Sequence, residues 1–104
     1  MTKLSENLPI EEARERLRQL IMELAVVRGH VVLASGKEAD YYVDLRRITL
    51  HHEASRLVGQ VMLDLLDKNG IEFEAAGGLT MGADPVGTAI MRAAGDQDLS
   101  LIHI

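Results

Sequence analysis

The chain has 104 residues, 47% of them hydrophobic, so it can form one domain with a modest core. Its net charge of −5 argues against a nucleic-acid partner, and the absence of cysteine excludes disulfides, a thiolate nucleophile and zinc–cysteine sites. No apolar run approaches the roughly 20 residues of a membrane span, and residues 1–10 lack a signal-peptide core, so we expect a cytoplasmic protein without a membrane partner.

The first predicted element is a helix over residues 9–28. Its apolar residues recur at helical spacing and form one stripe, made of Ile10, Ala13, Leu17, Leu20, Ile21 and Leu24. Pro9 suits the first helical position, and Gly29 is a natural stop. Arginines alternate with glutamates over residues 14–18, which predicts a solvated helix face and no basic binding patch.

A β-hairpin is predicted next, because the hydrophobic period changes to two after His30. Residues 31–33 and 41–45 are the β-prone runs, and residues 35–37 supply the turn. A lysine, two tyrosines, an aspartate and an arginine lie in this stretch and could together grip a planar, anionic small molecule. On these residues alone, a surface hairpin with one polar and one apolar face is the better interpretation.

A second helix is predicted over residues 54–66 and ends at Asn69-Gly70. Its broad apolar face consists of Ala54, Leu57, Val58, Val61, Met62, Leu65 and Leu66. Two adjacent histidines, His51 and His52, precede it. Neighbouring side chains on a helix point about 100° apart, so this pair does not match the i, i+4 spacing of a metal site, and a solvated helix start is expected.

The last part of the chain predicts a βαβ unit. Residues 73–76 form a short strand candidate, and a glycine-rich segment follows at 77–83. Asp84 and Pro85 then have the preferences of an N-cap and a first helical residue, and residues 99–104 begin another strand. This order is typical of a right-handed βαβ unit with a parallel sheet, so we expect an α/β fold.

The glycine-rich segment is the strongest chemical signal. Gly77, Gly78 and Gly82 lie between a strand and a helix start, where backbone N–H groups and the helix dipole suit a phosphate or diphosphate. The spacing fits neither the dinucleotide fingerprint nor a Walker loop. An ordinary tight turn therefore stays open as the alternative, and Asp84 is expected to cap the helix without contacting a ligand.

Two motifs together resemble one enzyme family. Residues 33–46 (LASGKEADYYVDLR) and 77–85 (GGLTMGADP) strongly resemble orotate phosphoribosyltransferase, and the resemblance extends in order over residues 9–99. It implies a type I phosphoribosyltransferase fold with a Rossmann-like parallel sheet, present here as a single partial domain over residues 1–104. Residues 1–48 would form the N-terminal helix and hood strands, and residues 49–104 the start of the α/β core.

The resemblance also implies a reaction, a cofactor and site residues. The family transfers the phosphoribosyl group of 5-phosphoribosyl 1-diphosphate (PRPP) to orotate, giving orotidine 5′-phosphate and diphosphate in pyrimidine biosynthesis. Its members are cytoplasmic, Mg²⁺-dependent homodimers. The residues implied for orotate are Lys37, Tyr42 and Val43, and those implied for the diphosphate of PRPP are Thr80, Met81 and Gly82. Val43 interrupts the family's aromatic pair, and Ala34 replaces a basic residue of some members.

The chain departs from the family near its end. The family's main PRPP signature, an acidic strand end followed by a Thr-Thr-Gly loop, and its lysine-rich mobile loop do not occur in this sequence. We therefore expect the catalytic residues beyond residue 104 and an N-terminal fragment that is inactive alone. Residues 100–104 fit the family's next strand poorly. The alternatives are another type I phosphoribosyltransferase acting on purines and a non-catalytic phosphate- or nucleotide-binding module.

Overall fold

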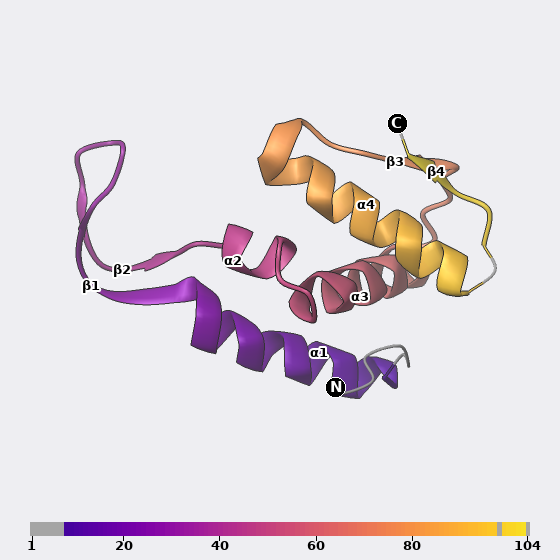
Figure 1. The fold of residues 1–104 in the computed structure, drawn as a ribbon, viewed down its shortest axis with the longest axis horizontal. Coiled ribbons are helices and arrows are strands. Elements are labelled where there is room, and N and C mark those ends of the chain that lie inside the picture. The colour runs from indigo at the N-terminus through magenta and orange to yellow at the C-terminus, as the bar shows by residue number, and fades with distance from the viewer. Residues whose placement is uncertain (1–7, 98, 104) are drawn as a thin grey trace.

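Helix α3 lies between helices α1 and α4 in the computed structural model, which describes residues 8–97 and 99–103 (Figure 1). The helices span Ile10–Leu20 (α1), Arg46–Thr49 (α2), Ala54–Lys68 (α3) and Thr80–Asp96 (α4). The predicted second helix is thereby confirmed, and the short α2 is an addition to the predicted elements. Within these residues, no helix is long and apolar enough to cross a membrane.

The strands form two small sheets. Strands β1 (Val26–Val32) and β2 (Glu38–Val43) pair as an antiparallel hairpin that extends away from the helices (Figure 1). Strands β3 (Ala75–Ala76) and β4 (Ile102–His103) pair in parallel, with α4 as the connection between them. The predicted hairpin and the predicted βαβ order are both confirmed, although β3 and β4 are shorter than the sequence indicates.

The first helix is shorter than its apolar stripe predicts. The stripe predicts a helix over residues 9–28, but α1 gives way to a π-helical turn (η1, Ile21–Ala25) and then to β1. Val26 and Val27 are β-branched, and both pair with the end of β2. Strand pairing thus prevails over the helical pattern, and Gly29 lies inside β1 with a φ of 127° instead of ending a helix.

Two small apolar clusters hold the helices together, and α3 contributes to both. The first cluster joins α1, η1, α2 and α3 and buries Ala13, Leu20, Ala25, Ile48, Ala54 and Leu57. The second joins α3 and α4 and buries Leu63, Ile90, Ala93 and Ala94. No polar or charged residue of the described chain is buried, so the removal of apolar surface from water provides most of the packing free energy.

The backbones of α3 and α4 contact each other directly at Gly59. A Cβ atom placed on Gly59 would lie 2.1 Å from the carbonyl oxygen of Ala89, which is far inside the contact distance of any side chain. Gly59 is buried, so the surrounding residues leave no room for a larger side chain. A glycine is therefore required for the two helices to cross at this distance.

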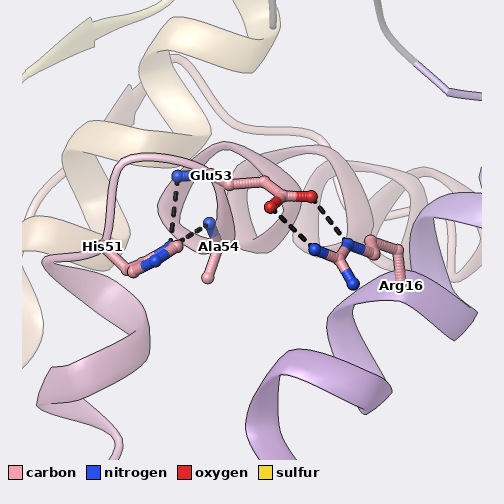
Figure 2. Close-up of polar contacts among 4 residues, drawn as sticks. All are labelled: Arg16, His51, Glu53 and Ala54. Carbon is pink, nitrogen blue, oxygen red and sulfur yellow. Dashed lines mark hydrogen bonds and ion pairs between the residues drawn. The ribbon is translucent and has the colours of Figure 1, made fainter. Parts of the chain in front are cut away.

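A salt bridge and a histidine organise the junction of α1 and α3 (Figure 2). Arg16 donates to both carboxylate oxygens of Glu53, through Nε at 2.7 Å and through Nη2 at 3.0 Å. His51 Nδ1 accepts the backbone N–H groups of Glu53 and Ala54 at 3.2 and 3.1 Å, which satisfies donors that the first turn of a helix leaves free. Arg16 and His51, which the sequence places on solvated surfaces, therefore make defined structural contacts.

We predict that Gly59→Ala destabilises the fold by about 1–3 kcal/mol, the usual cost of overpacking a filled site. The new methyl group has to push the α4 backbone away from α3. Urea unfolding followed by circular dichroism measures the change. Gly95→Ala is the matched control, because Gly95 lies in α4 and an added Cβ meets nothing within 4 Å. Equal stabilities of Gly59→Ala and wild type would contradict the close crossing.

We also predict an acid-sensitive contribution from Glu53. The hydrogen bond from Arg16 lowers the pKa of the Glu53 carboxyl from its ordinary value of 4.5. The ion pair therefore stabilises the fold fully above pH 4.5, and this contribution is lost as the pH falls through the lower folded pKa. The effect should be small, because both side chains are partly exposed to solvent.

Unfolding free energies measured in urea between about pH 3 and about pH 7, on both sides of the pKa of roughly 4.3 of an unperturbed glutamate, test this prediction. The wild type should lose more stability on acidification than Glu53→Gln, which keeps the side-chain shape without the ionisable carboxyl. Parallel pH profiles for the two proteins would show that the Arg16–Glu53 ion pair contributes nothing to stability.

Candidate functional site

The glycine-rich segment is divided between a loop and the start of a helix. Residues 77–79 form the loop after β3, and α4 begins at Thr80. The predicted order of strand, loop and helix is confirmed, but the expected start at Asp84-Pro85 is wrong by about one turn. The first turn of α4 contains the residues expected in an open loop, which are Thr80, Met81 and Gly82.

An extra turn before Pro85 explains the early start of α4. The Ala83 N–H donates to the Leu79 carbonyl at 3.3 Å and so adds a helical turn ahead of the proline. Proline lacks an N–H, so it cannot bond to the carbonyl four residues earlier, which belongs to Met81. The sequence preference for proline in a first turn is therefore overridden at the cost of one helical hydrogen bond.

The glycines of the loop allow it to pack directly on α4. A Cβ on Gly78 would lie 2.6 Å from the backbone carbon of Ala83, and one on Gly87 would lie 2.7 Å from the Cα of Gly77. A Cβ on Gly82, by contrast, would meet nothing within 4 Å. Gly77 and Gly78 thus permit the close contact between the loop and the helix. Gly82, in contrast, is next to open space.

Thr80 has an unusual backbone conformation at the start of α4. Its φ of 48° is positive, which is rare for a β-branched residue and costs about 1–3 kcal/mol. No side chain caps the helix, and Met81 is 60% exposed. The first N–H groups of a helix without a cap, together with its dipole, make this turn chemically suited to an anion.

Asp84 does not cap α4, contrary to the expectation from sequence. Its Oδ1 instead accepts the Gly78 N–H at 3.3 Å and lies 2.6 Å from Nε2 of His103 in β4. The side chain therefore connects the loop, the helix and the last strand. His103 is 19 residues away along the chain, so no local sequence pattern could reveal this contact.

A cavity of about 1030 Å³ adjoins this turn. It is lined by α3, α4, the glycine loop and β4, including Arg56, Thr80, Met81, Asp84, Arg92 and His103. Gly82 is not among the lining residues. Both arginine and aspartate side chains face this space, so its charge is mixed.

The structure does not bring the orotate candidates to this cavity. Lys37 lies at the hairpin turn, and Tyr42 and Val43 lie in β2, with 38% and 41% of their surfaces exposed. The hairpin contacts the rest of the described chain near its base, where the Asp44 N–H donates to the Ala25 carbonyl. The two groups of predicted site residues are therefore separated (Figure 1).

The described residues do not fit a resident Mg²⁺ site. Over residues 8–97 and 99–103, no group of three or more histidine, aspartate or glutamate side chains converges. Mg²⁺ prefers several carboxylate, phosphate or water oxygens in octahedral geometry, and Asp84 is already engaged with Gly78 and His103.

Several curated proteins are similar to this chain in sequence. Orotate phosphoribosyltransferase of Corynebacterium glutamicum is 55% identical over 92 residues, which are 88% of this chain and 49% of that protein. The enzyme of the same name from Mycobacterium avium is 56% identical over 85 residues, which are 82% of this chain and 46% of that protein. This chain is a relative of orotate phosphoribosyltransferase. No family model matches it.

Solved structures agree with the sequence relatives. The crystal structure of Mycobacterium tuberculosis orotate phosphoribosyltransferase in complex with Fe(III) dicitrate matches with a TM-score of 0.73 and 50% identity, over 88% of this chain and 49% of that one. The structure of that enzyme with PRPP matches with a TM-score of 0.67 and 52% identity, over 78% and 46%. The expected α/β phosphoribosyltransferase fold is confirmed.

The matches cover only part of each relative. The chain spans about half the length of the curated orotate phosphoribosyltransferases that it matches. The same holds for the M. tuberculosis orotate phosphoribosyltransferase structures. The similarity therefore concerns the fold of the matched residues, which are less than half of each relative.

Proposed function

We propose that this chain is part of an orotate phosphoribosyltransferase of pyrimidine biosynthesis. The whole enzyme would transfer the phosphoribosyl group of PRPP to orotate and release diphosphate. The observation that carries the proposal is the identity of more than half of the aligned residues to enzymes of this name. Residues 1–48 would supply the N-terminal helix and the hood, and residues 49–104 the start of the α/β core.

We propose that the first turn of α4 holds the diphosphate of PRPP. Thr80, Met81 and Gly82 lie in this turn, which has no side-chain cap and carries the positive end of the helix dipole. Backbone N–H groups held in place before the reaction stabilise charge that develops on the leaving diphosphate. In support, a relative has been solved with PRPP and with inorganic phosphate.

The hairpin is our proposed contact for orotate. Lys37 offers a cation, and the exposed Tyr42 offers an aromatic ring to a planar, anionic base. Val43, the next residue of β2, is exposed as well and would add an apolar contact from the neighbouring position. The hairpin is separated from α4 in this structure, so it has to be held over the base by other parts of the whole enzyme. We further propose that this enzyme is a cytoplasmic homodimer that requires Mg²⁺, with none of the described residues as a resident ligand.

A chimeric enzyme tests the proposal. Residues 9–97 of this chain would replace the matching segment of the M. tuberculosis relative, and the decrease in orotate absorbance would report turnover. We expect turnover with orotate and PRPP within about tenfold of the parent enzyme, equivalent to a change of about 1.4 kcal/mol in activation free energy. Activity with a purine base in place of orotate, or phosphate binding without turnover, would contradict the proposal.

We predict that the isolated chain shows no turnover above the uncatalysed rate. Positioning two reactants contributes about 7–11 kcal/mol to catalysis, and the described chain leaves the orotate and diphosphate candidates apart. The purified chain is incubated with orotate, PRPP and Mg²⁺, and the M. tuberculosis relative serves as the positive control. Turnover by a preparation free of host enzyme would show that the catalytic groups are already present in this chain.

A further inference from the structure

We propose that Asp84 is a positioning residue for the first turn of α4, where it holds the glycine loop and the strained Thr80 in place. The inference rests on the proposed function in one respect, namely that this turn binds the diphosphate of PRPP. The sequence pattern predicts Asp84 only as a helix cap, and the family resemblance assigns no role to this residue.

The contacts of Asp84 place it at the centre of the segment. A single oxygen, Oδ1, accepts the Gly78 N–H at 3.3 Å and lies 2.6 Å from Nε2 of His103. Gly78 itself packs against the backbone of Ala83, the residue before Asp84. The loop is thus attached to α4 by a steric contact and by a hydrogen bond, and Thr80 lies between the two attached points.

The first turn of α4 needs such an attachment. Thr80 has a φ of 48°, and strain of this kind persists only where the surrounding structure holds it. Pro85 removes the hydrogen bond that would otherwise reach the Met81 carbonyl, and no side chain caps the helix. The Gly78–Asp84 bond therefore spans a turn that has fewer helical bonds than an ordinary first turn.

His103 makes a carboxylate acceptable beside an anion site. A carboxylate oxygen accepts hydrogen bonds, so we assign Nε2 of His103 as the donor across the separation of 2.6 Å. This hydrogen bond directs positive potential at Oδ1 and offsets part of the charge that would repel a phosphate. Asp84 and Thr80 both line the same cavity, so the offset acts where the ligand would lie.

Two effects of Asp84 on anion binding have opposite signs and can be separated. If Asp84 acts through its charge, any neutral substitution at this position should tighten the binding of an anion. If Asp84 positions the turn, Asp84→Ala should weaken binding, whereas Asp84→Asn keeps an oxygen acceptor for Gly78 and should not weaken it. The alanine and asparagine variants therefore give different results only for a positioning role.

The experiment titrates the complete chain with inorganic pyrophosphate and follows backbone amide signals by nuclear magnetic resonance. For Asp84→Ala we expect the dissociation constant to rise about tenfold, as for loss of one hydrogen bond to a charged group. The Gly78 and Thr80 amides should shift and exchange faster, while those of α3 stay unchanged. Asp84→Asn should restore both the affinity and the two amide signals.

Each other outcome overturns the inference. Tighter binding by both variants would mean that Asp84 acts through repulsion, and a uniform change in all amides would mean a merely structural role. If the wild type does not bind pyrophosphate, the proposed function of this turn fails. The positioning role of Asp84 is still tested in that case, because the amide signals of Gly78 and Thr80 can be compared without any ligand. Unchanged signals in Asp84→Ala would contradict the positioning role.

Discussion

The crossing of α3 and α4 at Gly59 is the constraint on which the rest of the structure depends. The helices meet backbone to backbone there, so the direction of α4 relative to α3 is set by contact with Ala89. The buried residues of α3 divide between the two apolar clusters. One helix therefore holds α1 and α2 on one side and α4 with its strands on the other.

The position of α4 in turn decides what the glycine-rich segment can do. Gly77 and Gly78 lie in close contact with α4. Their lack of side chains is therefore required by the packing of the loop on the helix, whether or not a ligand binds there. The backbone N–H groups that remain available to a ligand are those of the first turn of the helix, at Thr80 and Met81. An anion there would meet helix N–H groups and a strained backbone held by neighbouring contacts, which is a different site from a flexible glycine loop.

The hairpin has few contacts with the rest of the described chain. Its strands pair well with each other, yet the described chain gives its exposed face nothing to pack against (Figure 1). A two-stranded hairpin alone is marginally stable in water, so the conformation of this segment should depend on additional contacts. The similarity to orotate phosphoribosyltransferase covers about half of that enzyme, in agreement with the separation of the two proposed subsites.

The sequence by itself determined the α/β order, the hairpin, the second helix and the resemblance to orotate phosphoribosyltransferase. These features depend on hydrophobic periods and on motifs that are continuous along the chain. The end of α1 and the start of α4 depend on the tertiary structure, because strand pairing at Val26 and the packing of the glycine loop on α4 compete with local preferences. The Arg16–Glu53 and Asp84–His103 contacts join residues 37 and 19 positions apart, and only packing of the helices brings such side chains together.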